Sequence, residues 1–186
     1  MVLLQSKSLN KPFSCPDFSL PTIDNNTFSV KSVTEPLLLV AFICNHCPYV
    51  KAIFDRFNNL AKNKKKDGLF TLAICSNDVN NYPEDSKENL LKNWQENKCA
   101  FVYALDEDQS IAKAFDAVCT PEFFLFNNKR ELFYHGRFDD NWQDETKVSA
   151  HELEDAINAL LKGERTPKVE KPSLGCSIKW KREGDR

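Results

Sequence analysis

The sequence predicts an α/β fold built around a mixed, parallel-rich sheet, and three observations lead to this expectation. Short apolar runs suited to buried strands alternate with stretches whose apolar residues recur at helical spacing. A late pair of such runs flanks the turn Asn127-Asn128-Lys129, which predicts an antiparallel hairpin. The chain has 186 residues, the length of one domain with elaborations. We therefore expect residues 1–186 to form a single domain with helices on both faces of the sheet.

The remaining elements follow in chain order. The predicted strands are at 17–20, 27–30, 37–43, 69–75, 101–105, 122–126 and 131–135, and the predicted helices are at 50–60, 86–96, 109–115 and 150–161. The first two strands form a hairpin within an N-terminal extension, 1–36, because Asp24-Asn25-Asn26 between them tolerates the geometry of a turn. The run at 37–43 is apolar throughout, which predicts a central parallel strand covered on both faces. Ser86 has the side chain of a helix N-cap and marks the start of the second helix.

Residues 162–186 are predicted to form a C-terminal tail docked on the domain. The tail is mostly charged, but Leu174, Cys176, Ile178 and Trp180 alternate with other residues as in a half-buried strand. Ordering such a segment costs about 1 to 2 kcal/mol of backbone entropy per residue. We therefore expect these four side chains to bury apolar area against the domain, with Cys176 facing inward.

Composition and charge exclude several classes of function. The chain has 25 Lys and Arg residues against 27 Asp and Glu residues, a net charge of −2, so we expect no nucleic-acid partner. Neither G-x-G-x-x-G nor G-x-x-x-x-G-K-[ST] occurs, which excludes the nucleotide-binding folds that need these loops. The longest apolar run, at 37–44, is far shorter than the about 20 residues of a membrane span. Residues 1–12 lack the apolar core of a signal peptide, so we expect a cytoplasmic protein with no membrane partner.

The segment Cys44-Asn45-His46-Cys47-Pro48 carries the most distinctive chemistry in the sequence. It lies between the end of a predicted buried strand and the first turn of a predicted helix. The free N–H groups and the positive dipole end of a helix stabilise an anion, so we expect Cys44 to be the more exposed thiol, with a pKa of about 4 to 7. Cys47 would follow one helical turn further along, close enough to form a disulfide with Cys44. His46 is expected to contact the Cys44 thiolate, which would make that disulfide more oxidising.

A zinc site and a pair of structural cysteines are the alternative interpretations of this motif. The sequence has no second C-x-x-C and no H-x₃₋₅-H, and its three histidines, His46, His135 and His151, are scattered. The seven cysteines are too few for a secreted disulfide scaffold and odd in number, so most should be free thiols in a reducing compartment. We therefore expect redox use of Cys44 and Cys47, with no metal and no cofactor.

Five segments of the sequence form an ordered set that spans nearly the whole chain. They are Pro16-Asp17-Phe18-Ser19-Leu20-Pro21, Phe42-Ile43-Cys44-Asn45-His46-Cys47-Pro48-Tyr49-Val50, Asn77-Asp78 with Tyr82-Pro83-Glu84-Asp85, Thr120-Pro121-Glu122-Phe123-Phe124-Leu125-Phe126, and Gly175-Cys176-Ser177-Ile178-Lys179-Trp180. This set resembles the thioredoxin superfamily, and more closely its peroxiredoxin-like (AhpC/TSA-like) proteins. The resemblance implies a thioredoxin fold in which Cys44 is the attacking thiol and Cys47 the resolving thiol. It also implies a cis peptide bond between Thr120 and Pro121 facing the pair, and we expect the Thr120 backbone to pair there with a substrate chain as an added strand.

Two departures from these families bear on the chemistry. Thioredoxins have a buried acid six residues before the first motif cysteine, where this sequence has Leu38. Removal of the Cys47 proton must then use water or another group; Glu122 is our candidate, with a solvated strand start as its alternative role. True peroxiredoxins carry P-x-x-x-[ST]-x-x-C, and aligning Cys47 with that cysteine leaves Val40 and Cys44 at the Pro and the Ser or Thr positions. The missing motif argues against efficient peroxide reduction.

Two further cysteines are candidates for an auxiliary role. Cys119 lies two residues before Pro121, so we expect it near the redox pair, with packing as its alternative role. Cys176 in the tail is expected either to pack or to act as a third redox thiol that exchanges disulfides with Cys44.

Together these observations predict a thiol-disulfide oxidoreductase. Cys44 attacks a protein or small-molecule disulfide, and Cys47 resolves the mixed disulfide. A thiol reductant such as a thioredoxin then restores the dithiol. Two alternatives stay open: a thiol-dependent peroxidase that passes through a sulfenic acid, and a non-enzymatic redox-sensing module whose C-x-x-C state changes the docking of the tail.

Overall fold

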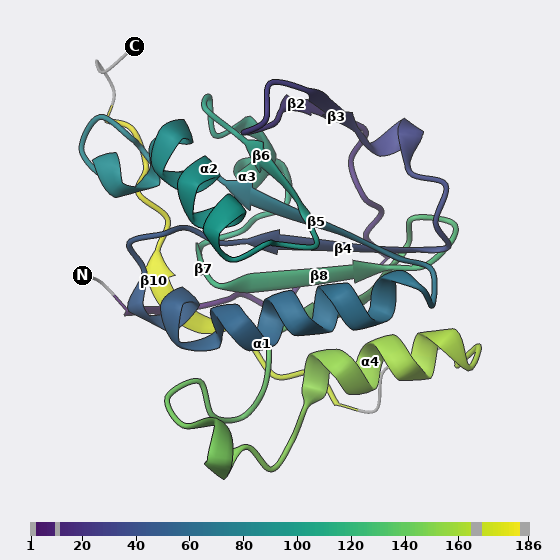
Figure 1. Ribbon diagram of the computed structural model, residues 1–186. Coiled ribbons are helices and arrows are strands. Elements are labelled where there is room, and N and C mark those ends of the chain that lie inside the picture. The colour runs from purple at the N-terminus through teal and green to yellow at the C-terminus, as the bar shows by residue number, and fades with distance from the viewer. Residues whose placement is uncertain (1–2, 10–11, 165–168, 183–186) are drawn as a thin grey trace.

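The central element of the fold is a five-stranded mixed sheet. The computed structural model describes residues 3–9, 12–164 and 169–182, and Figure 1 shows the sheet running through its middle. In spatial order the strands are β6 (Val102–Leu105), β5 (Leu69–Cys75), β4 (Leu37–Phe42), β8 (Glu122–Phe126) and β9 (Leu132–Gly136). The pairs β4–β5 and β5–β6 are parallel, whereas β4–β8 and β8–β9 are antiparallel. The prediction of a parallel-rich sheet with a late antiparallel hairpin is confirmed.

Helices cover both faces of this sheet, as predicted. The elements on one face are α1 (Pro48–Lys65), α2 (Lys87–Glu96) and α4 (Glu152–Leu161), and those on the other are α3 (Ser110–Ala114) and the hairpin of β2 (Ser19–Pro21) with β3 (Thr27–Ser29). Short 3₁₀ helices, η1 (Val30–Ser32), η2 (Pro83–Asp85) and η3 (Glu145–Lys147), lie in the connections. Within the described ranges, no helix has the length and apolar composition that crossing a bilayer requires.

The two apolar cores follow from the pleat of β4. Leu37, Leu39 and Ala41 pack toward α1, and the residues that alternate with them pack toward α3. Every residue of β4 is at most 4% exposed, which explains why the strand is apolar throughout. The C-terminal end of β4 leads directly into the segment with the two motif cysteines.

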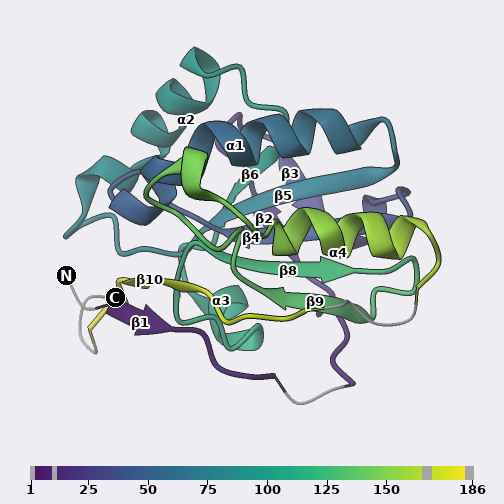
Figure 2. The ribbon, with the colours of Figure 1, turned by 90° about the horizontal axis from the view of Figure 1, so that it is seen from below.

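A second, three-stranded sheet holds the C-terminal tail against the domain. β10 (Leu174–Ser177) lies between β1 (Leu3–Gln5) and β7 (Cys119–Thr120) and is antiparallel to both; Figure 2 shows it beside β1. Cys176 is 1% exposed and faces inward, as predicted. Leu174 and Trp180 are 43% and 40% exposed, so the prediction that they are buried is wrong. Strand pairing on both edges of β10 holds the tail, and this pairing does not require four buried apolar side chains.

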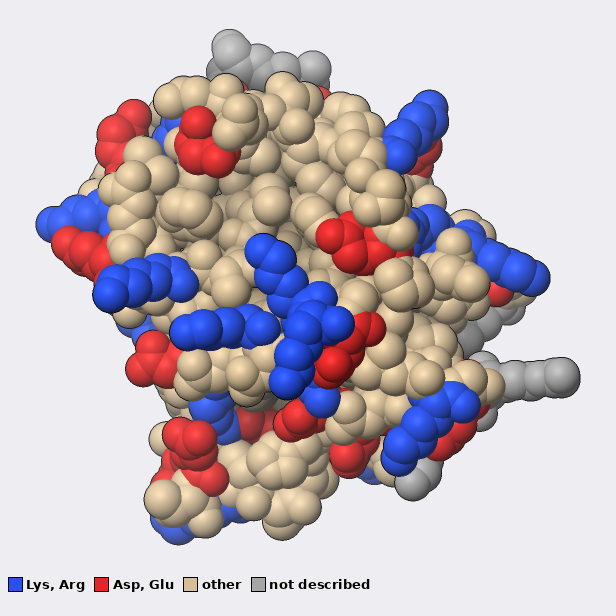
Figure 3. Space-filling model, turned by 45° about the vertical axis from the view of Figure 1, so that its right-hand side comes forward, with Lys and Arg blue, Asp and Glu red and all other residues tan. Residues whose placement is uncertain are grey.

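Charges of both signs are interspersed over the surface shown in Figure 3, with several Lys or Arg side chains gathered near its centre. The last turn of α1 carries three lysines, Lys62, Lys64 and Lys65. Of these, Lys64 donates a hydrogen bond to Asn158 at 2.7 Å and pairs with Glu154 at 3.3 Å. These contacts join α1 to α4.

Candidate active site

The two motif cysteines lie in the loop that joins β4 to α1. α1 begins at Pro48, so Cys47 is the N-cap residue of the helix. Cys44 lies three residues before Cys47, outside the helix. The prediction that Cys44 occupies the helix N-terminus, with Cys47 one turn further, is therefore wrong. The reason is Pro48, whose fixed backbone angle and missing N–H suit the first helical position.

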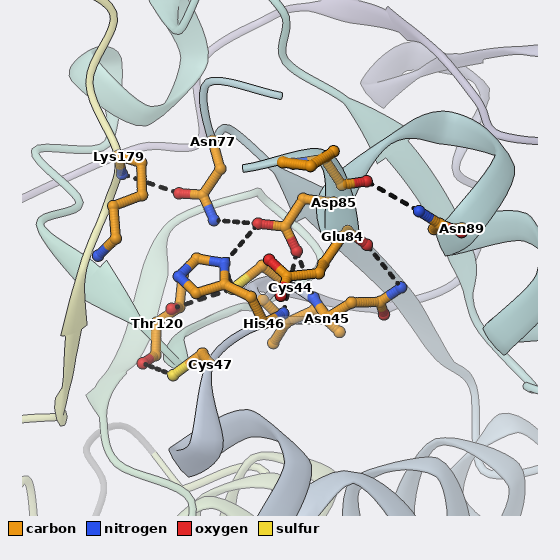
Figure 4. Close-up of polar contacts among 12 residues, drawn as sticks. Cys44, Asn45, His46, Cys47, Asn77, Glu84, Asp85, Asn89, Thr120 and Lys179 are labelled. Atoms are coloured by element: carbon orange, nitrogen blue, oxygen red, sulfur yellow. Dashed lines mark hydrogen bonds and ion pairs between the residues drawn. The ribbon is translucent and has the colours of Figure 1, made fainter. Parts of the chain in front are cut away.

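Both cysteines are buried thiols that contact the loop before β8. Cys44 is 1% exposed and Cys47 is 0% exposed, and both are free; Cys47 is shielded as predicted, but Cys44 is buried as well. The Cys44 sulfur lies 3.5 Å from Thr120 Oγ1, and Cys47 can donate a hydrogen bond to the Thr120 carbonyl oxygen at 3.1 Å (Figure 4). The Thr120–Pro121 peptide bond is cis, as predicted. The loop before β8 thus covers the cysteine pair and accounts for its burial.

The pKa values of the two thiols are shifted in opposite directions. Burial, contact with Cys47 and the negative charge of Asp85 raise the pKa of Cys44 well above its usual range. The hydrogen bond from Cys44, against the opposing effect of burial, lowers the pKa of Cys47 to about 5, and Thr120 and the Val50 backbone N–H lower it further. The prediction that Cys44 has the lower pKa is therefore wrong, and the thiolate of the pair is Cys47. As a thiolate Cys47 accepts a hydrogen bond from Cys44, whereas as a thiol it donates to the Thr120 carbonyl oxygen.

The start of α1 accounts for this difference between the two thiols. The unpaired N–H groups and the positive dipole end of a helix stabilise an anion only near its first turn. Cys47 is the N-cap residue, and the Val50 N–H contributes to its lowered pKa. Cys44 lies outside the helix and beside the carboxylate of Asp85, whose charge disfavours a second anion.

Asp85, in η2 just before α2, holds the cysteine loop in place by hydrogen bonds. It is 0% exposed, and its carboxylate accepts hydrogen bonds from the backbone N–H groups of Asn45 and His46 at 2.7 and 3.1 Å. It also faces His46 Nδ1 at 2.6 Å and accepts a hydrogen bond from Asn77 Nδ2 at 2.8 Å (Figure 4). Burial acts to raise the pKa of Asp85, but the bonds from His46 and Asn77 outweigh it, so the pKa is lowered. Neither Asp85 nor Asn77 was assigned a role from the sequence, where the signal for both was their place in segments that carry the family resemblance.

His46 makes the predicted contact with Cys44, but its partner is Asp85. Its Nδ1 lies 3.6 Å from the Cys44 sulfur and 2.6 Å from Asp85 Oδ2, and its ring stacks on Tyr82 with centroids 5.0 Å apart. Because Asp85 is ionised, it accepts the hydrogen bond that the His46 Nδ1–H donates. His46 therefore orients the loop more than it stabilises a Cys44 thiolate.

Cys44, His46 and Asp85 also place one sulfur, one nitrogen and one oxygen atom within 4.8 Å of one another. A metal ion at this position would use the His46 nitrogen and the Asp85 oxygens. Those atoms bond to each other, and the carboxylate also accepts three further hydrogen bonds from Asn45, His46 and Asn77. Hydrogen bonds already occupy the Asp85 carboxylate, so these atoms are suited to holding the loop.

Glu122 belongs to a second buried cluster. It is 0% exposed, so a solvated strand start is excluded for it. Its Oε1 lies 2.7 Å from His135 Nε2, and its Oε2 accepts hydrogen bonds from the Val118 and Cys119 N–H groups at 2.9 and 3.2 Å. These contacts engage both carboxylate oxygens away from Cys47, so the structure gives no support to Glu122 as the group that deprotonates Cys47.

Cys119 and Cys176 lie near Cys47, in the paired strands β7 and β10. Cys119 is buried, and burial together with the adjacent Glu122 carboxylate raises its pKa far above the usual value. Cys176 hydrogen-bonds to Cys47, and burial raises the pKa of Cys176 to about 12. The fold therefore brings both cysteines close to the redox pair, as predicted, and places Cys176 against Cys47.

The backbone of Thr120 is already paired within this chain. β7 is antiparallel to β10, and Thr120 lies opposite Cys176 in the register. Gly175 approaches so closely that a Cβ atom there would lie 2.0 Å from the Thr120 carbonyl oxygen. The prediction that a substrate chain pairs with Thr120 as an added strand is wrong, because β10 of the same chain occupies that position.

A hollow of about 510 Å³ opens beside Cys44, between α1 and α2. Its wall includes Cys44 and Asn45 from the loop, Lys51 from α1, and Lys92 and Asn93 from α2. This volume falls within the range of about 300 to 1,000 Å³ that is usual for small-ligand sites.

Known proteins share the fold of this chain. The chain matches the model of the AhpC/TSA family over residues 14–135. An uncharacterized conserved protein from Geobacillus kaustophilus is 38% identical, with a TM-score of 0.92 over 97% of each chain. A hypothetical protein from Sinorhizobium meliloti is also 38% identical, with a TM-score of 0.90 over 95% of this chain and 98% of that one. A putative thiol:disulfide interchange protein from Chlorobium tepidum, 19% identical, shares the fold with a TM-score of 0.66 over 83% of this chain and 99% of its own. No curated protein matched the chain.

Proposed function

Because the chain belongs to the AhpC/TSA family and has a thioredoxin fold, we propose that it is a thiol-disulfide oxidoreductase with Cys44 and Cys47 as its reacting thiols. The observation that carries this proposal is the pairing of two buried thiols, one of which has a pKa of about 5. A dithiol with one stabilised thiolate is the reduced form of a disulfide-exchange centre. Thr120 and the cis Pro121 close the centre from the side of β8.

In this proposal Cys44 is the thiol that attacks the substrate disulfide. Cys44 forms part of the wall of the hollow between α1 and α2, whereas Cys47 is 0% exposed. The Cys44 proton passes to the Cys47 thiolate, which acts as the general base. The Cys44 sulfur bonds to one substrate sulfur, the substrate S–S bond breaks, and the other half leaves as a thiolate. The Thr120 carbonyl oxygen accepts the hydrogen bond of the newly protonated Cys47.

Cys47 then resolves the mixed disulfide. The departing thiolate takes the Cys47 proton, and the Cys47 sulfur attacks the Cys44 sulfur. The Cys44–Cys47 bond forms and the second half of the substrate leaves as a thiolate, so two electrons pass from the protein to the substrate. An external thiol reductant, such as a thioredoxin, restores the dithiol.

A side-by-side assay of disulfide reduction and peroxide consumption tests this function. The substrates are hydroxyethyl disulfide and hydrogen peroxide, with NADPH oxidation through thioredoxin reductase and thioredoxin as the readout. We expect the wild type to reduce the disulfide, and Cys44→Ser and Cys47→Ser to lose about 100-fold or more, because each removes a sulfur that forms a bond. Cys99→Ser is the matched control, since Cys99 packs near Trp94 at the other end of α2. Disulfide reduction retained in either motif variant would contradict the proposal.

A thiol-dependent peroxidase is the second candidate, and the lowered pKa of Cys47 at a helix N-cap favours it. The Cys47 thiolate would attack a peroxide oxygen, the O–O bond would break with hydroxide as the leaving group, and the resulting Cys47 sulfenic acid would condense with the Cys44 thiol to form a disulfide and water. Val40 and Cys44 occupy the positions where the peroxide motif has Pro and Ser or Thr, so we place this activity second. Peroxide consumption faster than disulfide reduction would reverse the order, and a single oxidation without turnover would indicate a redox-sensing module.

We also propose Cys176 as an auxiliary thiol that exchanges with Cys47. The Cys176 sulfur would attack the Cys47 sulfur of the Cys44–Cys47 disulfide, that disulfide bond would break, and the departing Cys44 sulfur would take the Cys176 proton, with no net change in oxidation state. The hydrogen bond between the Cys176 and Cys47 side chains supports this route. Mild oxidation and disulfide mapping by mass spectrometry should recover a Cys47–Cys176 bond. Recovery of the Cys44–Cys47 bond alone, with Cys176→Ser fully active, would leave Cys176 a packing residue.

A further inference from the structure

The edge on which an extended protein substrate would dock is closed. β10 pairs with β7 on one side and with β1 on the other, so a substrate strand could reach Thr120 only by displacing a strand paired on both edges. Ser173, just before β10, is 1% exposed and donates a hydrogen bond to the Gly136 carbonyl oxygen at 2.6 Å. The contact between Gly175 and Thr120 leaves no room for another backbone. Access to Cys44 from another direction would not require β10 to be displaced.

The hollow between α1 and α2 supplies that direction. Cys44 and Asn45 are part of its lining. Its lining is rich in amide groups: Asn93 Nδ2 donates to Asn45 Oδ1 at 3.0 Å, and Asn97 Nδ2 donates to Asn93 Oδ1 at 2.8 Å. This chain of amides runs from the cysteine loop along α2, so polar groups follow the hollow outward from Cys44.

Charges of both signs border the same hollow. Lys51 and Asp55 come from α1, and Lys92 and Glu96 from α2, with the last two forming an ion pair at 4.0 Å. Val50 and Phe54 of α1 add a small apolar surface. A ligand that carries both ammonium and carboxylate groups on a short apolar stem matches these three features together.

We propose that the hollow between α1 and α2 binds a small zwitterionic disulfide, of the amino-acid or short-peptide class, and presents its S–S bond to Cys44. The proposal rests on the proposed function, because Cys44 forms the mixed disulfide with one half of this substrate and the other half leaves as a thiolate. Protein disulfides are correspondingly poor substrates, since β10 fills the edge on which they would align.

Single-turnover oxidation of the reduced protein tests the substrate class without any external reductant. The probes are cystine, which is zwitterionic at both ends, the uncharged hydroxyethyl disulfide, and insulin as a protein disulfide. Acid quenching, alkylation and mass spectrometry measure the oxidised fraction over time. We expect cystine to oxidise the protein at least about tenfold faster than insulin does, which corresponds to about 1.4 kcal/mol. Equal rates, or faster oxidation by insulin, would overturn the proposal.

Charge reversal within the hollow tests its role in binding. Lys51→Glu and Lys92→Glu should each lower the ratio of the cystine rate to the hydroxyethyl disulfide rate by about fivefold, the upper range for one exposed ion pair. Lys62→Glu, on the same helix but outside the hollow, is the control and should leave the ratio unchanged. An unchanged ratio in both lysine variants would overturn the proposal.

A redox-inert probe separates failure of the hollow from failure of the proposed function. Lanthionine, the thioether analogue of cystine, has no S–S bond to reduce. We expect calorimetry to show binding to the wild-type protein and weaker binding to Lys51→Glu and Lys92→Glu. Lanthionine binding without any disulfide reaction would refute the proposed function alone. Disulfide reaction with hydroxyethyl disulfide, but no lanthionine binding, would refute the hollow alone.

Discussion

Two buried histidine–carboxylate pairs in this protein have nearly the same geometry and sit beside different thiols. His46 Nδ1 lies 2.6 Å from Asp85, and His135 Nε2 lies 2.7 Å from Glu122; both carboxylates are 0% exposed. Each histidine ring stacks on an aromatic side chain. Together with burial, the charge of Asp85 raises the pKa of Cys44, and in the same way Glu122 raises the pKa of Cys119. Each pair therefore keeps its neighbouring thiol protonated.

The difference between the pairs lies in the backbone that each carboxylate holds. Asp85 accepts hydrogen bonds from the N–H groups of the cysteine loop, whereas Glu122 accepts them from the residues that lead into Thr120. The first pair thus positions Cys44, and the second positions the strand that covers Cys47. Cys47 lies between them and receives its stabilisation from the Cys44 thiol and the start of α1. A carboxylate near a redox thiol can therefore direct the thiolate to the other cysteine.

The largest expected effect is on stability, and it should be similar for both pairs. Asp85→Ala and Glu122→Ala each leave a buried histidine and several N–H groups without an acceptor. We expect each substitution to lower the free energy of unfolding by about 3 to 5 kcal/mol, the usual cost of removing one partner of a buried pair. Urea denaturation followed by circular dichroism measures this. A loss below about 1 kcal/mol in one variant would break the equivalence of the two pairs.

Asn77 links Asp85 to the C-terminal tail, and its substitution should have the next largest effect on stability. Its Nδ2 donates to Asp85 at 2.8 Å, and its Oδ1 accepts the Lys179 N–H at 2.8 Å. Asn77→Ala should lower the free energy of unfolding by about 1 to 3 kcal/mol, because both partners are buried. Hydrogen exchange should also become faster at the Lys179 amide. Unchanged exchange at this amide would show that the tail is held independently of the Asp85 cluster.

Isosteric substitutions sharpen the comparison by removing the charges alone. In a Cys47→Ser background, Asp85→Asn should lower the pKa of Cys44, because it removes the negative charge beside that thiol. Alkylation of Cys44 at neutral pH should then be about tenfold faster, the effect of one neighbouring charge. Glu122→Gln should leave Cys44 alkylation unchanged and speed that of Cys119. Mass spectrometry of the labelled peptides gives both rates, and acceleration of Cys44 by Glu122→Gln would contradict the separation of the two pairs.

The pH dependence of the free energy of unfolding should show that Asp85 is ionised in the folded protein. The pKa of Asp85 is lower in the folded protein than its usual value, despite opposing burial, because of the bonds from His46 and Asn77. Its ionised form therefore stabilises the fold at pH values above the unfolded pKa of about 3.9, and this contribution is lost as pH falls through the folded pKa. Asp85→Asn should flatten the decrease in stability between about pH 4 and pH 2. An unchanged slope would mean that Asp85 is not ionised in the folded protein.

Helices and strands that depend on local sequence patterns are well predicted from the sequence. The apolar run at 69–75 coincides with β5, and Ser86 caps α2 by accepting a hydrogen bond from the Asn89 N–H, because burial and capping are encoded locally. β1 and β7 have no such pattern, since three-residue and two-residue strands owe their existence to pairing with β10. The pattern at 174–180 predicted that this segment docks, but it could not show that β10 lies between β1 and β7.

For the candidate site, the sequence predicts which residues lie together better than it predicts which thiol ionises. The motif identified Cys44 and Cys47, yet α1 begins at Pro48, so its N-cap residue is Cys47 and not Cys44. Asp85 reaches the loop from a 3₁₀ helix far along the chain, and no local spacing encodes that contact. The place of Glu122 after Pro121 suggests a proton acceptor for Cys47, but its side chain contacts His135. Long-range contacts thus decide which thiol ionises.

The central claim is that the thiolate resides on Cys47 and is stabilised by the Cys44 thiol. Its most direct test is a titration of thiolate ultraviolet absorbance in the reduced wild type, Cys44→Ser and Cys47→Ser. The account predicts a transition near pH 5 in the wild type, its loss in Cys47→Ser, and a shift to higher pH in Cys44→Ser. A low-pH transition that persists in Cys47→Ser and disappears in Cys44→Ser would place the thiolate on Cys44 and contradict the account.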